Sequence, residues 1–199
     1  MSWLRKAFGH FKKICIHKWW VFYYSFHFGV PWRGFIHDWS KFHPVEFLES
    51  VKFYNGMESP IPIAKKAQGY SLAWQHHKGH NEHHYEYWVD NLDSHGTTIP
   101  MPFECVMEMI ADWFGAGRAY KGKGFTYLDE CNWWDWKKST NPKMNVHTIE
   151  LVDYIFDNIR FFEGFDWVRQ SDNLTRLKNR YRMMIDGTLP SLTTNRQQK

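Results

Sequence analysis

A chain of 199 residues, 43% of them hydrophobic and 23% charged, has the balance of one globular domain that is long enough to bury a core. Its net charge of +4 conceals basic ends and an acidic middle; such ends are either solvated surface or a docking face for an anionic substrate, and nucleic acid is an open but less favoured partner. The three widely separated cysteines lack a Cys-x-x-Cys pair, which argues against a disulfide framework or zinc ribbon and predicts a reducing cytoplasm.

The first predicted helix runs from Trp3 to about Phe28 and ends before Gly29 and Pro31. Its longest aromatic and apolar run, 12 residues, is too short to span a bilayer, and its start does not resemble a secretory signal. We therefore expect no membrane partner. Apolar residues recur at helical spacing in a stripe along one face of this helix, and His17 lies on that face. His17 is therefore expected to point inward, either as a core histidine or as a metal ligand. This stripe contains Ile14, His17, Val21, Tyr24 and Phe28.

A second helix is predicted over Trp32–Trp39, with Arg33 one turn before His37 on the same face. The adjacent His37 and Asp38 supply an imidazole nitrogen and a carboxylate oxygen, which together can bind a divalent metal. Lys41 follows Asp38 by three residues, so in a helix it would lie on the carboxylate's face as a cation for an anion beside the metal.

After the His-Asp pair, the sequence predicts a helix from His43–Pro44 through Phe53, a loop at residues 55–62 and a helix over Ala64–Lys78.

Five histidines occur among the nine residues 76–84. His76 and His83 are seven residues apart, as are His77 and His84, so either pair shares a face of a continuing helix. Gly79 and Asn81 could equally form a loop that folds both pairs inward. The spacing does not choose between the pairs, and a histidine-rich surface loop is the alternative; His80 is the expected bystander.

A helix is predicted over Phe103–Tyr120, after a loop at residues 90–102, and it places Asp112 within an apolar stripe. A buried carboxylate needs a partner, which would be either a metal or a salt bridge to Arg118 or another basic side chain. Gly115 and Gly117 would let a ligand approach the backbone or would serve helix packing.

The remaining elements are predicted from pattern alone: a basic loop at residues 121–124, a helix at Tyr127–Lys138, a core helix around Val152 and a last helix at Asp172–Ile185 capped by Ser171. The chain is therefore expected to be all-α, with one domain at residues 1–187 and a polar, disordered tail at residues 188–199.

The order of these residues resembles the HD-domain metal-dependent phosphohydrolases, whose sites often contain His-Asp-x-x-Lys, here His37, Asp38 and Lys41. It is closest to the binuclear branch that includes the HD-GYP phosphodiesterases. The resemblance implies a helical bundle of the HD-domain type in which one ion is held by His17, His37, Asp38 and Asp112, and a second by the middle histidines, with Asp38 bridging. Those middle histidines are His76, His77, His83 and His84. The sequence lacks that branch's glutamate and its Gly-Tyr-Pro triplet, so cyclic-dinucleotide specificity does not carry over. Residues 17–120 are also similar to an uncharacterised family of phage and bacterial proteins.

The expected function is hydrolysis of a phosphoester of a nucleotide, or of a cyclic or short oligonucleotide, by a metal-activated hydroxide. Asp38 and Lys41 would be catalytic; Lys41, Arg33 and Arg118 would bind phosphate, and Trp74 or Tyr120 could stack a base. Imidazole-rich ligation favours two divalent ions of Mn, Fe, Co, Ni or Zn. The alternatives are an HD-like di-iron oxygenase and a non-enzymatic phage protein that inhibits a host protein. The spacing predicts neither the substrate nor the oligomeric state.

Overall fold

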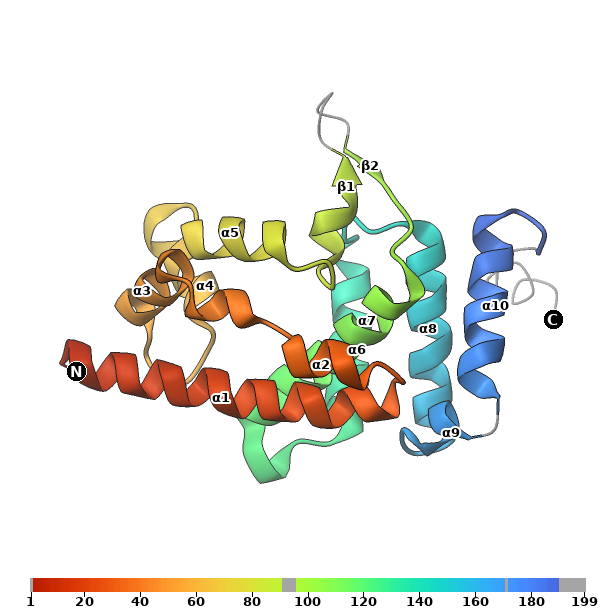
Figure 1. Cartoon of the computed structure of the whole chain (residues 1–199), viewed down its shortest axis with the longest axis horizontal. Coiled ribbons are helices and arrows are strands. Elements are labelled where there is room, and N and C mark those ends of the chain that lie inside the picture. Colours follow the sequence, from red (N-terminus) through yellow and green to blue (C-terminus); the bar gives the residue numbers. More distant parts are fainter. Residues whose placement is uncertain (1, 91–95, 171, 190–199) are drawn as a thin grey trace.

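The computed structural model describes residues 2–90, 96–170 and 172–189, and this part of the chain is all-α, as predicted (Figure 1). The N-terminal half contains α1 Trp3–His27, α2 Pro31–Ile36, the 3-10 turn η1 Trp39–Phe42, α3 Pro44–Phe53, α4 Pro60–Gln68 and α5 Leu72–His80. Next come the turn η2 Tyr85–Trp88 and two antiparallel strands, β1 Val89–Asp90 and β2 Thr97–Thr98. The remaining elements are α6 Phe103–Lys121, η3 Gly122–Gly124, α7 Tyr127–Ser139, α8 Val146–Phe161, α9 Asp166–Arg169 and α10 Asn173–Ile185.

Helices α1 and α6 form the pair around which the others are arranged. They are antiparallel, because Lys13 reaches Ala119 whereas Val21 packs on Gly115. A Cβ at Gly115 would lie only 2.9 Å from the backbone nitrogen of Val21, so this glycine permits close helix packing. A side chain at Gly117 would clash with the ring of Phe125. Both glycines therefore serve packing rather than the approach of a ligand.

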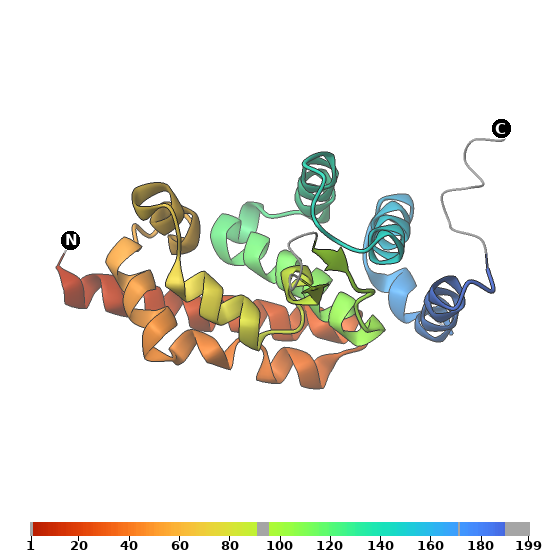
Figure 2. The ribbon, with the colours of Figure 1, turned by 90° about the horizontal axis from the view of Figure 1, so that it is seen from above.

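The other helices are divided between the two ends of α1 (Figures 1 and 2). Helices α3, α4 and α5 lie over its N-terminal half, whereas α8, α9 and α10 lie toward its C-terminal end. The stripe predicted to face inward is buried and supplies part of the core, including Val21 and Phe28, which are fully buried. A neighbouring stripe of α1, with Phe8 at 72% and Phe26 at 46% exposure, faces outward. No helix in the three described ranges is long and apolar enough to cross a bilayer.

Several predicted boundaries were wrong, two of them because the backbone turns where a helix was expected to continue. The second helix ends at Ile36 rather than Trp39, because His37 leaves the helical region, with ψ 134°, and Asp38 then adopts the left-handed conformation, with φ 55°. The helix predicted over Ala64–Lys78 is two helices, separated at Gly69, whose φ is 84°. Helix α4 begins inside the predicted loop, at Pro60.

Two other predicted loops or termini fall partly outside the described residues. The predicted loop at residues 90–102 includes strand β2, of which Thr98 pairs with Val89. The proposed cap Ser171 and most of the predicted tail, residues 190–199, lie outside the residues that the structure describes. Helix α10 begins at Asn173, one residue later than predicted.

Glu130 on α7 is a buried acid that should make stability depend on pH. Burial raises its pKa to about 8, and the charge of Asp112 adds to the effect. An unfolded chain ionises this group near its ordinary pKa, 4.5, so the free energy of unfolding should fall as the pH rises from there to about 8. We expect Glu130→Gln to raise that free energy by about 2 kcal/mol at pH 8.5, where a neutral side chain replaces a buried charge, and to change it little at pH 4.5.

The measurement is denaturant unfolding at both pH values, with Glu163→Gln, a change at an exposed glutamate, as the matched control. An equal effect of Glu130→Gln at both pH values would show that the change alters packing rather than a titration.

Candidate metal centre

Four segments that are distant in the sequence bring their polar side chains together beside the α1–α6 pair. His17 comes from α1 and Asp112 from α6, whereas His37 and Asp38 occupy the break between α2 and η1. The Lys18 ammonium donates to the His37 carbonyl oxygen and helps to fix this break against α1. The fourth segment, α5 and the loop after it, supplies the remaining imidazoles.

The first group of side chains lies where both long helices meet the break. Its members each offer one ligand atom within 4.8 Å of the others: His17, His37, Asp38 and Asp112. The Nε2 atom of His17 is 3.0 Å from Asp112 Oδ1 and 3.3 Å from Asp38 Oδ2. The Nε2 atom of His37 is 3.2 Å and 3.0 Å from the same two oxygens, respectively. All four residues are buried, so this is an interior site and not a surface cluster.

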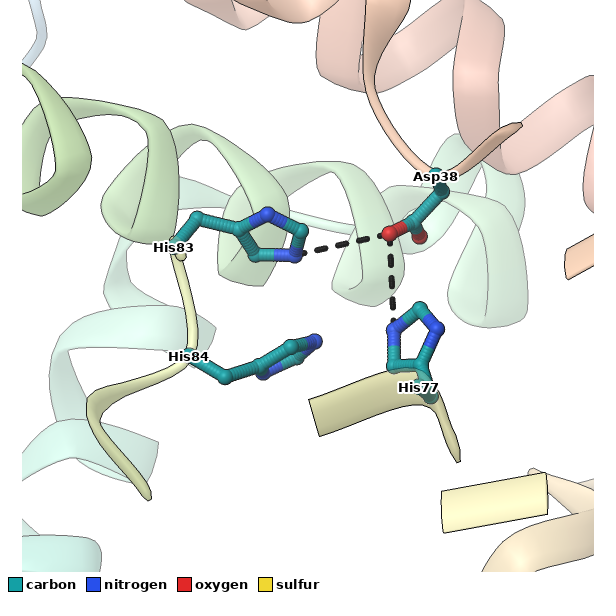
Figure 3. Close-up of side chains that lie close together, drawn as sticks. All are labelled: Asp38, His77, His83 and His84. Atoms are coloured by element: carbon teal, nitrogen blue, oxygen red, sulfur yellow. Dashed lines mark ion pairs between the residues drawn. The ribbon is translucent and has the colours of Figure 1, made fainter. Parts of the chain in front are cut away.

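The second group adjoins the first through the other oxygen of the same aspartate (Figure 3). Its members are Asp38, His77, His83 and His84. The Nε2 atoms of His77 and His83 each lie 3.4 Å from Asp38 Oδ1. Figure 3 shows the ring of His84 directed into the space between the other two imidazoles. Asp38 therefore presents Oδ2 to one group and Oδ1 to the other.

The second group contains buried polar atoms that make no hydrogen bond in the described part of the chain. Among the described residues, Asp38 Oδ1, His83 Nε2 and His84 Nε2 are buried and accept or donate no hydrogen bond. A buried polar atom without a hydrogen bond destabilises the fold by about 1–3 kcal/mol. Because these three atoms face the same point, they indicate a binding site for a ligand there. Imidazole nitrogens and a carboxylate oxygen are the donor set of a divalent transition metal. These buried side chains could therefore hold a metal ion.

Two glutamates that the sequence analysis did not identify orient the imidazoles. Glu46 on α3 accepts a hydrogen bond from His77 Nδ1 at 2.8 Å, which leaves Nε2 of that ring directed at Asp38. Glu108 on α6 accepts from His37 Nδ1 at 3.0 Å and lies 3.3 Å from His83 Nδ1. A carboxylate on the far nitrogen of a ligand histidine fixes its tautomer and ring orientation. Glu108 could have been noticed, because it lies one helical turn before Asp112.

His76 lies outside both groups, although the spacing favoured it as much as His77. Its Nδ1 donates to Glu46 Oε1 at 2.7 Å, and its ring stacks between His43 and His80, with centroids 4.4 and 4.0 Å away. His80, the expected bystander, belongs to this stack and to neither group. The helix α5 ends at His80, so the spacing of seven residues along one helix face does not apply to His83 and His84.

The charges around Asp38 keep it ionised although it is buried. Burial disfavours the carboxylate, but His37 and Lys41 outweigh it and hold the pKa of Asp38 well below its usual range. Lys41 Nζ lies 2.5 Å from Asp38 Oδ2. For Asp112, hydrogen bonds from His17 and His37 likewise outweigh burial and hold its pKa well below the usual range. Burial, together with His83, lowers the pKa of His84 well below its ordinary value, which favours the neutral form that binds metals.

The two arginines predicted to bind phosphate have other partners. Arg33 Nε lies 2.6 Å from Glu108 Oε2, so this guanidinium supports the glutamate that orients His37. Arg118 packs over the ring of Trp20, 4.8 Å from its centroid, and donates to the Phe125 carbonyl oxygen at 3.2 Å. Asp112 is thus paired with His17 and His37 and not with Arg118.

A protein-family model, DUF5662, described as a family of unknown function, matches residues 6–158. The match spans α1 to α8 almost entirely and includes every residue of both groups. No curated protein and no solved structure match the chain.

Proposed function

We propose that this chain, which belongs to DUF5662, a family of unknown function, is a metal-dependent phosphohydrolase with two adjoining ion sites. One observation carries the proposal: a single buried carboxylate, Asp38, is shared by two imidazole-containing groups and has the ammonium of Lys41 beside it. Two divalent ions on a bridging carboxylate, with a cation alongside, is an arrangement suited to phosphoester hydrolysis. The resemblance to HD-domain phosphohydrolases implies the same grouping and adds support.

The two groups divide the ligands between the ions. His17, His37 and Asp112 would hold one ion with Asp38, and the other ion would take the second oxygen of Asp38 and three further imidazoles: those of His77, His83 and His84. Bound ions of this kind polarise phosphoryl oxygens and lower the pKa of water. The imidazole-rich donor set favours Mn, Fe, Co, Ni or Zn over Mg.

Lys41 is the residue that we assign to the substrate phosphate. Burial disfavours its charge, but the carboxylates of Asp38 and Asp112 outweigh burial and raise its pKa, so the ammonium stays charged at neutral pH. Lys41 also lines a cavity that reaches His17, His84 and Asp112. A phosphate entering from this cavity would meet the Lys41 ammonium beside the ligand groups, where negative charge develops during hydrolysis.

The test is a panel of nucleotides and simple phosphoesters with added Mn, assayed for phosphate release by the wild type and Lys41→Ala. We expect Lys41→Ala to keep its metal content but to lose about ten- to a thousandfold in kcat/KM, since one electrostatic contact is removed. Lys41→Arg should recover only part of the rate, because the planar guanidinium of arginine keeps the charge but not the compact shape of the ammonium. Lys123→Ala, in the exposed turn η3, is the matched control and should equal the wild type.

Two results would contradict the proposal. Equal rates and metal content in Lys41→Ala and the wild type would remove the role of Lys41. Oxygen consumption by the iron-loaded protein without phosphate release from any ester would favour a di-iron oxygenase, whose ligands would be the same histidines and aspartates.

A further inference from the structure

A cavity of about 220 Å³ extends from the candidate metal centre along the α1–α6 pair. His17, His84 and Asp112 line one end, and His10 lines the cavity from further along α1. His10 precedes His17 by seven residues, which on a helix is a distance of about 10 Å. On α6, Ala116 and Tyr120 follow Asp112 at intervals of four residues and line the facing wall. The cavity thus has a ligand-bearing end and a distant end.

The wall between these ends is mostly apolar and aromatic. Its apolar members include Ile14, Pro60, Ile61, Ala73 and Ala116. Trp74 packs edge-on against the imidazole of His84, with ring centroids 5.0 Å apart, and Tyr120 borders the cavity from α6. Such a wall suits a flat group that gains by leaving water and by contact with aromatic rings.

The charged side chains of the wall are already engaged. Lys13 Nζ donates to the Ala119 carbonyl oxygen at 3.0 Å and lies 4.6 Å from the ring centroid of Tyr120. Glu46 accepts from the imidazoles of His76 and His77. Neither charge is therefore directed at a ligand in this part of the cavity.

His10 is the exception, because it is buried and its Nδ1 has no partner. The residue is 7% exposed, and Nδ1 makes no hydrogen bond within the described residues. Its ring lies against Phe47 and Tyr54, with centroids 5.4 and 5.7 Å away. Burial, followed by the charge of Lys41, lowers the pKa of His10 to about 4, so the ring is neutral near pH 7. A neutral imidazole can donate or accept at Nδ1 according to its tautomer.

We propose that this cavity binds the leaving group of the substrate, and that His10 selects a leaving group that is flat, mostly apolar and carries one hydrogen-bonding atom at its end remote from the phosphate. The inference rests on the proposed phosphohydrolase function, with the phosphate beside Lys41. Hydrolysis breaks the P–O bond to this group; the water oxygen and its remaining proton stay with the phosphate, and the group leaves as an alcohol after taking up a proton. His10 touches the leaving group alone, so it sets specificity and takes no part in proton transfer.

Two bicyclic esters test the role of His10. In 4-methylumbelliferyl phosphate the ring system carries a carbonyl oxygen at the end opposite the phosphate, whereas 2-naphthyl phosphate has a similar shape without that oxygen. We expect His10→Phe to lower the ratio of kcat/KM for the first ester to that for the second by about three- to tenfold, the effect of one neutral hydrogen bond. The effect should appear mainly in KM, because the contact is remote from the reacting bond.

The matched control is His27→Phe, the same substitution on the same helix at a residue outside the cavity, and it should leave this ratio unchanged. A second variant, Ala116→Leu, fills the cavity, so it should lower kcat/KM for both bicyclic esters relative to that for glycerol 2-phosphate. A fluorescence titration of the metal-loaded full chain with 4-methylumbelliferone, the alcohol product, gives a readout without turnover. Its Kd should rise about three- to tenfold in His10→Phe.

The outcomes separate this inference from the proposed function. Release of phosphate from both esters with an unchanged ratio in His10→Phe, or with no effect of Ala116→Leu, would overturn the leaving-group site and leave the phosphohydrolase intact. Failure of the wild type to hydrolyse any ester would overturn the proposed function. In that case, weaker binding of 4-methylumbelliferone by His10→Phe than by the wild type would still support a ligand-binding cavity in which His10 contacts the ligand. Equal binding by the two proteins would overturn it.

Discussion

Replacing Asp38 with asparagine is expected to abolish the binding of both ions and to reduce phosphate release by on the order of a thousandfold or more. Asparagine has nearly the same size as aspartate, so the fold should be kept while the charge is lost. The effect should be larger than that of His37→Ala, because Asp38 presents one oxygen to each of the two groups, whereas His37 belongs only to the first of these two. Elemental analysis of protein purified without a metal-binding tag gives the metal stoichiometry directly.

The matched control is His80→Ala, since His80 lies beside the ligand segment but belongs to neither group. Circular dichroism should show the same helix content in Asp38→Asn, His80→Ala and the wild type. An unchanged metal stoichiometry in Asp38→Asn would show that the Asp38 carboxylate is not shared by two ions, and the assignment of the metal site would then be wrong.

Chelation is expected to lower the melting temperature of the wild type by roughly 5 to 10 °C, and added metal should restore it. Without ions, Asp38 Oδ1, His83 Nε2 and His84 Nε2 are buried and make no hydrogen bond among the described residues, so bound ions would stabilise the folded chain and not the unfolded one. At a free ion concentration of 100 times Kd, binding raises the free energy of unfolding by about 2.7 kcal/mol. For a domain of this size, each kcal/mol of added free energy of unfolding raises the melting temperature by about 2–4 °C.

Asp38→Asn serves here as the negative control, because a chain that binds no ion should melt at the same temperature with and without chelator. Identical melting curves for the wild type in the two conditions would instead agree with the alternative raised by the sequence, a histidine cluster without a metal.

The candidate ligands that lie on regular helices could be located from the sequence. His17 was placed inward by the apolar stripe of α1, and Asp112 by the stripe of α6, and both are buried beside each other. Helical periodicity carries this information because a continuous helix keeps residues three and four apart on one face. The adjacent His37 and Asp38 were identified from their residue types, although the helix assumed for them ends at Ile36.

The choice among the clustered histidines depends on where α5 ends, and periodicity does not encode that position. His77 lies on the last turns of α5 and faces Glu46, whereas His83 and His84 follow the helix and turn back toward Asp38. His76, one residue from His77, is rotated by about 100° around the helix and stacks on His43 instead. Glu46 was missed because nothing in its local spacing relates it to imidazoles distant in sequence, whereas the position of Glu108, four residues before Asp112, was a signal that could have been used.

The α1–α6 pair also has a consequence during synthesis of the chain on the ribosome. Val21 and Gly115, which pack against each other, are separated by 94 positions, from 21 to 115. At translation rates of about 5–20 residues per second, α6 follows α1 after roughly 5 to 20 seconds. Throughout that interval the inward stripe of α1, including Val21 and Tyr24, lacks the helix that buries it. During this interval the uncovered apolar stripe exposes the nascent chain to aggregation and offers a binding surface to a chaperone.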